Sequence, residues 1–259
     1  MERILDVHVH IGESLTGIYT AEDALSFMDA NDITYAVISP VPTYPLPEGV
    51  KSSMKQNDAI ALALKQYPRR FLRGLGVVDP RHGKAAVPEV DRIFEELGLH
   101  GLMFSTDKTG LTFDNPIMLE FFEHASKYEN PVILAHTSQY SVLEAPYMLR
   151  KMAEKFPMIT FINASSMKDT THSNCSRYLS ASVDNIYLDT ANIHPLMTPI
   201  EWAVREAGEN KLLFGTDTPF ATYCTEKRMI DTADITEEQR RKIYWENAAR
   251  IFKIKEESI

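Results

Sequence analysis

The chain is poor in cysteine, in excess positive charge and in long apolar runs, and each shortage excludes a class of protein. Only two cysteines, Cys175 and Cys224, occur in 259 residues, so a fold held by disulfides is not expected. The net charge of -9 argues against nucleic acid as a partner, because phosphate binding needs a basic surface. No apolar run is long enough to span a bilayer, so no membrane partner is expected.

The N-terminal segment also lacks the features of a secretion signal. MERILDVHVH passes from charged residues directly into a short apolar stretch, with no long hydrophobic region and no small-residue cleavage site. The hydrophobic content of 44% and the charged content of 24% are ordinary for a globular protein with a sizeable core. We therefore expect a cytoplasmic protein.

Eight short apolar runs alternate with amphipathic segments along the chain. The runs lie at residues 4–10, 34–40, 71–79, 100–105, 131–136, 159–165, 186–191 and 211–217. Most are continuously apolar, as expected for parallel strands that are covered on both faces. This order predicts an α/β fold with a single domain over residues 1–259, built as a distorted (β/α)8 TIM barrel. An open doubly wound sheet is the alternative, but no glycine-rich phosphate loop supports it.

One connection, residues 39–56, is rich in proline and has no regular period. It follows the second predicted strand, so it is expected above the mouth of the barrel. Long structureless loops inside a compact domain are often lids or binding loops, and a stiff surface connection is the alternative.

The segment DVHVHIG, residues 6–12, places two histidines at the end of the first predicted strand. Residues i and i+2 of a strand face the same side, so His8 and His10 should point together with their Cα atoms roughly 7 Å apart. Asp6 would share that face, one step deeper. An isolated pair of this kind is a weak signal, and a structural role is the alternative to metal binding.

Two other predicted strand ends also carry groups that bind metals. His136 ends the apolar run PVILAH, and Asp217 ends KLLFGTD. Singly, a buried histidine and a turn-capping aspartate would explain them. Because strand ends of a barrel meet at one face, these residues and the H-x-H pair together suit Zn²⁺, Mn²⁺, Fe²⁺ or Co²⁺.

The sequence resembles the amidohydrolase superfamily, most closely the amidohydrolase-2 group. That group includes metal-dependent hydrolases and decarboxylases of the aminocarboxymuconate-semialdehyde and resorcylate types. The resemblance covers nearly the whole chain through the motifs YPRRFLRGLGVVDP, PVILAHTS, NIYLDTA, LLFGTDTPF and ENAARIF. It implies a barrel with one divalent ion on His8, His10, His136 and Asp217, and Asp217 would also take the proton of the metal-bound water. Zinc is the first expectation, with manganese, iron and cobalt as alternatives.

Two positions depart from the pattern of that group. Met103 lies near the position at which relatives with two metals carry a carboxylated lysine, so a single ion is expected. Asn163 stands where the group usually has a histidine after the sixth strand. An amide can stabilise an oxyanion but cannot transfer a proton at neutral pH. His172 is a candidate substitute, and an exposed loop histidine is the alternative.

The roles of three other polar residues stay open. Asp6 is a candidate to orient a ligand imidazole through its ring N–H, and a buried hydrogen bond to the backbone is the alternative. Lys108 and Lys168 are candidates to bind an anionic substrate, and ordinary exposed lysines are the alternative. No substrate-binding residue is assigned.

The leading hypothesis is a metal-dependent hydrolase of a small ester, lactone or amide. A metal-activated water would attack the carbonyl, Asp217 would take the proton, and Asn163 would stabilise the oxyanion. The first alternative is a metal-dependent non-oxidative decarboxylase of a small aromatic or unsaturated acid. The missing strand-six histidine and the short chain count against it, because proton delivery is its central step.

The second alternative is a non-catalytic barrel that binds a metal or a ligand. The expected partner is a small-molecule substrate, and a homo-oligomer is left open.

Overall fold

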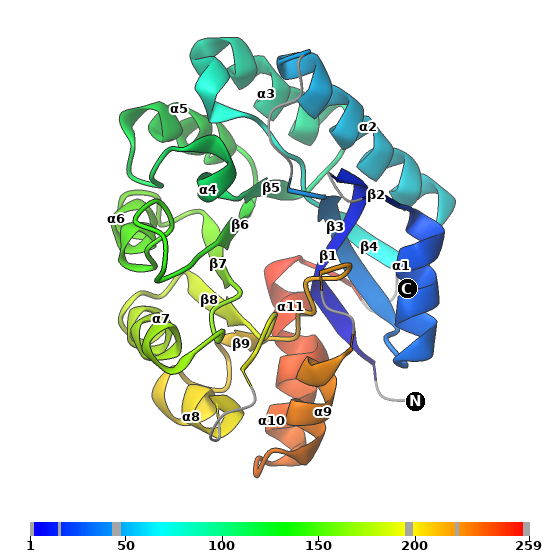
Figure 1. Cartoon of the computed structure of the whole chain (residues 1–259), viewed down its shortest axis with the longest axis vertical. Coiled ribbons are helices and arrows are strands. Elements are labelled where there is room, and N and C mark those ends of the chain that lie inside the picture. Colours follow the sequence, from blue (N-terminus) through cyan, green and yellow to red (C-terminus); the bar gives the residue numbers. More distant parts are fainter. Residues whose placement is uncertain (1–2, 15–16, 43–47, 195–198, 221–222, 256–259) are drawn as a thin grey trace.

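Eight parallel strands form the centre of the fold, and helices surround them (Figure 1). The fold comes from a computed structural model, which describes residues 3–14, 17–42, 48–194, 199–220 and 223–255. The parallel strands are β1 (Leu5–Ser14), β3 (Tyr35–Pro40), β4 (Phe71–Gly74), β5 (Gly101–Phe104), β6 (Val132–His136), β7 (Thr160–Ala164), β8 (Ile186–Asp189) and β9 (Leu212–Leu213). A further strand, β2 (Gly17–Tyr19), pairs antiparallel with the end of β1.

Two hydrogen-bonded sheets, β2-β1-β3-β4 and β5-β6-β7-β8-β9, make up the ring of strands. A parallel bridge between Gly76 and Leu102 joins the sheets on one side, and another between Val9 and Thr218 joins them on the other. The ring is therefore closed, with interrupted ladders at two places. The predicted (β/α)8 barrel is confirmed.

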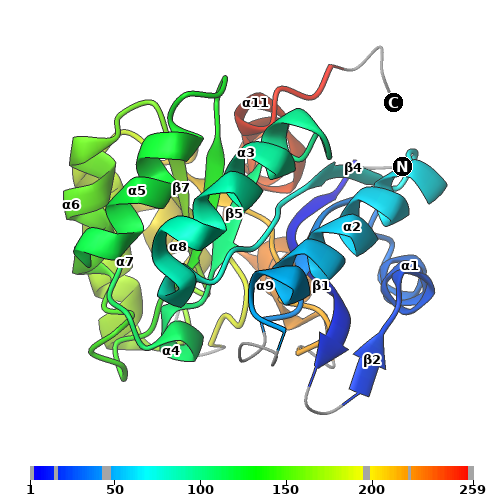
Figure 2. The same ribbon diagram turned by 90° about the horizontal axis from the view of Figure 1, so that it is seen from above.

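Helices on the outside of the ring separate successive strands. They are α1 (Ala21–Ala30), α2 (Val50–Gln66), α3 (Val87–Glu95), α5 (Pro116–Ala125), α6 (Tyr147–Lys155), α7 (Thr170–Ser182), α8 (Pro199–Glu206), α9 (Thr225–Thr232), α10 (Glu237–Arg241) and α11 (Asn247–Ile251), with the short elements η1 (Pro80–Ala86), α4 (Thr106–Thr109) and η2 (Lys242–Glu246). Figure 2 shows α2, α3 and α5 side by side on one flank. In the described part of the chain, no helix combines the length and apolarity needed to cross a membrane.

Helix α5 illustrates why these segments cover the sheet. The Asn115 side chain accepts a hydrogen bond from the N–H of Ile117 and caps the first turn, and proline follows at the first helical position. The buried side chains of the helix are Met118, Phe121, Phe122 and Ala125. Their spacing places them on one face of the helix, which therefore packs on the barrel wall.

Two predicted strands, the third and the eighth, end earlier than expected. Beyond their ends, side chains take over hydrogen bonds that a neighbouring strand would otherwise make. The N–H of Val77 donates to the side chain of Asn57 at 2.7 Å, and the N–H of Thr216 donates to Asp6 at 3.1 Å. Apolar residues continue past both ends, at Leu75 and Val77 after β4 and at Phe214 after β9, so hydrophobicity alone could not locate these ends.

The proline-rich connection, residues 39–56, is only partly irregular. Residues 50–56 form the first turns of α2, so the expectation of a structureless segment is wrong there. Residues 43–47 lie outside the described part of the chain, and the lid function stays a prediction.

A bulge in β1 changes which residues face the barrel interior. Asp6 pairs with Ala36, and Val9 pairs with Ile38, so β1 advances three residues where β3 advances two. An extra residue in one strand reverses the inward and outward positions beyond it. The bulge therefore places Asp6, which precedes it, on the opposite face of β1 from His8 and His10.

Gly101 begins β5 against the backbone of β6, where a side chain has no room. A Cβ atom at this position would lie 1.8 Å from the carbonyl oxygen of Val132. We expect Gly101→Ala to lower the free energy of unfolding by about 3 kcal/mol or more, measured by urea denaturation. Gly98→Ala is the control, because its Cβ meets no described atom within 4 Å and adds only the strain of a φ of +65°. Equal losses in the two variants would contradict the steric explanation.

Candidate metal centre and active site

A cavity of about 390 Å³ lies at the C-terminal ends of the barrel strands. The side chains of His8, His10, His136 and Asp217 all line it. They come from β1, from the end of β6 and from the segment after β9, which are far apart in the sequence. The C-terminal face of a (β/α)8 barrel is the face on which such enzymes carry their active sites.

His8, His10 and Asp217 form a buried cluster. The two Nε2 atoms lie 3.0 Å apart, and Oδ1 of Asp217 lies 3.3 Å from Nε2 of His8 and 3.2 Å from Nε2 of His10. Atoms bound at about 2.1 Å to one cation lie about 3.0 Å apart in octahedral geometry and about 3.4 Å apart in tetrahedral geometry. The cluster therefore has the spacing of ligands on one ion.

The other ring nitrogens fix which tautomer each histidine adopts. Nδ1 of His8 lies 2.7 Å from the carboxylate of Asp189, and Nδ1 of His10 lies 3.0 Å from the carbonyl oxygen of Pro40. Since both partners accept hydrogen bonds, each Nδ1 carries the hydrogen and each Nε2 presents a lone pair. Two lone pairs at this distance repel each other unless a proton or a metal ion lies between them. The donor set thus fits a divalent cation.

The pKa values of His8, His10 and Asp217 also indicate that the cluster favours a positive charge. Burial lowers the pKa of His8, but the carboxylates of Asp217 and Asp189 outweigh burial and raise it to about 9. Burial lowers the pKa of His10, and the nearby charge of His8 lowers it further. Burial raises the pKa of Asp217, but His8 and His10 outweigh it and keep this pKa below its ordinary value. One positive charge is therefore stable among these three groups.

His136 lines the same cavity but has different neighbours. Its Nδ1 lies 2.8 Å from the carboxylate of Glu144, and its Nε2 lies 3.0 Å from Nζ of Lys168. Because Glu144 accepts the hydrogen of Nδ1, the Nε2 lone pair of His136 receives the Lys168 ammonium. The structure thus brings three of the four predicted ligands into contact and places the fourth on the same cavity wall, with its Nε2 again free of hydrogen.

Glu144, His136 and Asp107 form a second group of metal-binding residue types, with ligand atoms within 4.8 Å of one another. Its carboxylates already have partners. Asp107 accepts from Ser105 at 2.8 Å and from Lys108 at 2.9 Å. Glu144 is therefore a hydrogen-bonded support for His136, and Asp107 is held by Ser105 and Lys108.

Asp6 does not orient an imidazole. Its oxygens accept hydrogen bonds from the backbone N–H groups of His8 and Thr216 and from the hydroxyl of Thr216. The bulge in β1 removes Asp6 from the face of His8 and His10, which simple alternation had assigned to all three. The backbone hydrogen bond, which was the alternative role, is the one that the structure has. Asp189 orients His8 instead.

Asn163 and His172 do not line the cavity, so the structure contradicts their predicted catalytic positions. Both are buried. The hydroxyl of Thr137 donates to Oδ1 of Asn163 at 2.5 Å and lies 2.8 Å from Nε2 of His172. On β7, Ala164 faces the cavity, so its neighbour Asn163 faces the covering helices. The hydrogen-bonded group of Thr137, Asn163 and His172 therefore lies between the sheet and α7, away from the cavity.

Three residues that hydrogen-bond the candidate ligands were not predicted: Asp189, Glu144 and Asn192. Asp189 ends β8, as His136 ends β6, so a search of every strand end would have found it. Asn192 donates to Oδ2 of Asp217 at 2.5 Å and fixes that carboxylate. Glu144 lies in a loop, and its sequence has no signal for this role.

Three of the non-glycine residues with strained backbone angles lie beside the cluster. Ser165, Asn192 and Asp217 all have positive φ angles, of 56°, 56° and 61°. Such conformations are costly for residues with a side chain and are often found at functional sites. Asn192 also contacts the other two side chains through its amide nitrogen. The strained backbone therefore holds one connected set of groups.

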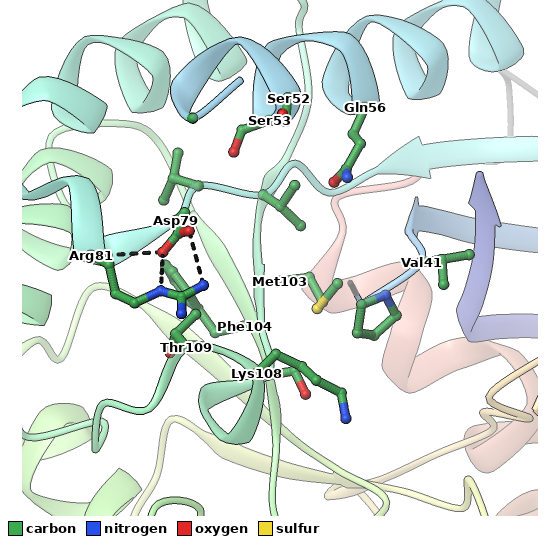
Figure 3. A pocket seen from close by; sticks show the side chains of 15 residues that line it. Val41, Ser52, Ser53, Gln56, Asp79, Arg81, Met103, Phe104, Lys108 and Thr109 are labelled. Atoms are coloured by element: carbon green, nitrogen blue, oxygen red, sulfur yellow. Dashed lines mark hydrogen bonds and ion pairs between the residues drawn. The ribbon is translucent and has the colours of Figure 1, made fainter. Parts of the chain in front are cut away.

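A smaller cavity of about 60 Å³ adjoins the main one and shares Met103, Ser105 and Lys108 with it. Figure 3 shows its wall, in which Asp79 pairs with Arg81 at 3.1 Å. Because these two charges neutralise each other, the recess is polar without an excess of charge.

The geometry defines a (β/α)8 barrel with a metal-binding cluster at the mouth of its strands. The model of the family described as "Amidohydrolase" matches residues 5–254, and the chain belongs to this family. A curated relative, a gamma-resorcylate decarboxylase of a Polaromonas species, is 25% identical over 252 residues, which cover 79% of this chain and 77% of the relative.

Solved structures share the fold. A 2,6-dihydroxybenzoate decarboxylase in complex with 2,6-dihydroxybenzoate has a TM-score of 0.78 and 17% identity, covering 98% of this chain and 99% of that one. A Polaromonas dihydroxybenzoic acid decarboxylase, with bound manganese and the inhibitor 2-nitroresorcinol, has a TM-score of 0.77 and 18% identity, covering 100% and 99%.

Asp189→Ala should weaken metal binding by roughly 10- to 100-fold, since His8 would lose the carboxylate that orients its ring. Equilibrium dialysis with Mn²⁺ measures this. Asp114→Ala is the control, because Asp114 pairs with Lys151 on the surface. Equal Mn²⁺ affinity in parent and Asp189→Ala proteins would show that His8 needs no such support.

His172 makes stability depend on pH. Burial lowers its pKa from 6.5 to about 4. The unfolded chain therefore takes up this proton first, and stability falls as the pH drops from 6.5 to 4. His172→Gln should remove up to about 3 kcal/mol of that fall, measured as urea-unfolding free energy at pH 7 and pH 4.5. His124→Gln on α5 is the control, and an unchanged pH slope in His172→Gln would contradict the assignment.

Proposed function

We propose that the protein is a metal-dependent, non-oxidative decarboxylase of a small aromatic acid. The observation that carries the proposal is a set of three imidazoles and Asp217 in one cavity, in a chain whose relatives include decarboxylases of dihydroxybenzoic acids. The hydrolase was the leading expectation from the sequence, and the relatives favour its first alternative instead.

Two arguments from the sequence had counted against decarboxylation. The first was the missing strand-six histidine. From β7, Ala164 lines the cavity and Asn163 faces away, so another residue of the cavity must deliver the proton. The second was the length of 259 residues, but the matched regions cover 77% of the curated relative and 99% of the two solved decarboxylases. The length argument therefore no longer weighs against the proposal, and the histidine argument requires a different proton donor.

His8, His10, His136 and Asp217 would hold the ion. We propose manganese in place of zinc, because a similar structure contains bound manganese. When bound, a divalent ion supplies positive charge that attracts the acid group and neighbouring oxygens of a substrate. In each of the three histidines an acceptor holds the hydrogen of Nδ1, so Nε2 is the nitrogen that can bind an ion, which supports this ligand set.

The apolar part of the cavity suits an aromatic ring. Met103, Leu134 and Phe220 line it, and the Phe220 ring packs edge-on against His10 with centroids 5.9 Å apart. Apolar walls with a few convergent polar groups are typical of small-ligand sites.

Decarboxylation breaks the bond between a ring carbon and the carboxyl carbon. The electron pair stays on the ring carbon, which takes a proton as CO₂ leaves. Asp217 is ionised at neutral pH, because its pKa lies below the ordinary carboxyl value. It must therefore first take a proton, from a phenolic hydroxyl of the substrate or from water, before it can give one to the ring carbon. We assign this two-step proton transfer to Asp217. Asp107 also lines the cavity, but Lys108 already pairs with it. Asn192 holds Oδ2 of Asp217, so its carboxylate is fixed toward the cavity.

Manganese-loaded protein should release CO₂ from 2,6-dihydroxybenzoate. A chelator should abolish the release, added Mn²⁺ should restore it, and Asp217→Asn should lower kcat by at least about 100-fold. Asp114→Asn, outside the cavity, is the matched control. Turnover of aryl esters or lactones without CO₂ release would support the hydrolase instead, and turnover of neither would support the non-catalytic alternative.

Purified parent protein should contain about one equivalent of divalent metal by elemental analysis, and His8→Ala should contain almost none, since removal of one ligand opens the site. Two equivalents would contradict the single-ion site. Circular dichroism of the variant verifies that it remains folded.

A further inference from the structure

Lys168 lies four residues after β7 and extends its ammonium group into the main cavity. There Nζ donates to Nε2 of His136 at 3.0 Å. Among the described residues, this ammonium forms no ion pair with a carboxylate within 4.0 Å. Lys108 lines the same cavity but pairs with Asp107 at 2.9 Å. A carboxylate therefore neutralises the charge of Lys108, whereas the partner of Lys168 in the cavity is a neutral imidazole nitrogen.

The lone pair on Nε2 of His136 can serve one partner at a time. Glu144 holds the hydrogen of Nδ1 at 2.8 Å, so Nε2 is the atom left to bind either the ammonium or a metal ion. A divalent ion and an ammonium that share this nitrogen would also repel each other. Metal binding by His136 therefore requires Lys168 to leave.

We propose that Lys168 is the anion-binding residue of this cavity, exchanging His136 for the acid group of the substrate when a metal ion takes the imidazole. The substrate half of this inference rests on the proposed function, whereas the exchange at His136 does not.

The chemistry of a partly buried ammonium supports the exchange. After losing its acceptor, the group would stay unpaired near a dication, which is costly in a cavity of low polarity. A carboxylate between the ion and Lys168 satisfies both charges. The flexible side chain of lysine can make this movement without a change in the barrel backbone. Lys168 would thus favour substrates that carry an acid group.

The exchange is tested first without substrate, by equilibrium dialysis of Mn²⁺ against parent, Lys168→Met and Lys108→Met proteins. Lys168→Met should bind Mn²⁺ roughly tenfold more tightly, which corresponds to the loss of one competing charge-assisted hydrogen bond. Lys108→Met should gain clearly less, since Asp107 neutralises Lys108. Unchanged affinity in Lys168→Met, or equal gains in both variants, would overturn the exchange.

The anion contact is tested by calorimetric titration of 2,6-dihydroxybenzoate into manganese-loaded protein. Lys168→Met should weaken binding by at least tenfold, and Lys168→Arg should restore most of it, because guanidinium also pairs with carboxylate. Equal affinity in parent and Lys168→Met would overturn the anion role.

The two proposals fail separately. Binding of the acid that depends on Lys168, without CO₂ release, would reject the decarboxylase and keep the inference. Release of CO₂ with Mn²⁺ affinity and acid affinity both independent of Lys168 would reject the inference alone.

Discussion

Two imidazole nitrogens that face each other in a buried site are the constraint on which the rest of the structure depends. Nε2 of His8 and Nε2 of His10 lie 3.0 Å apart, and acceptors on the far side of each ring hold the hydrogens away from this contact. In a site with little water, opposed lone pairs are costly without a positive charge between them. Asp217 adds a carboxylate at the same point, so the fold prepares a place for a cation.

The cluster forms where the first and last parallel strands of the barrel meet. The N–H of Asp217 donates to the carbonyl oxygen of His8 at 2.9 Å, and Asp6 bonds the backbone of Thr216. Gly215 lies in the same segment, next to Thr216. A Cβ atom at Gly215 would come within 3.1 Å of the Cβ of His8, so this glycine lets the two segments approach closely. The contacts that close the barrel are therefore the contacts that position the candidate ligands.

The sequence predicted the order of strands well, because continuous apolar runs mark buried parallel strands wherever they occur. The position of the candidate ligands at strand ends was also predictable, since strand order alone brings His136 and Asp217 to one face. Side-chain direction was not predictable in detail. A bulge in β1 removed Asp6 from the shared face, and alternation on β7 turned Asn163 outward. Both depend on backbone register, which hydrophobicity does not encode.

The most direct test of the central claim is anomalous diffraction from crystals of the manganese-loaded protein. The account predicts one anomalous peak, with Nε2 of His8, His10 and His136 and a carboxylate oxygen of Asp217 within about 2.4 Å of it. A peak bound by other side chains, or one that leaves His8 and His10 without contact to the ion, would contradict it.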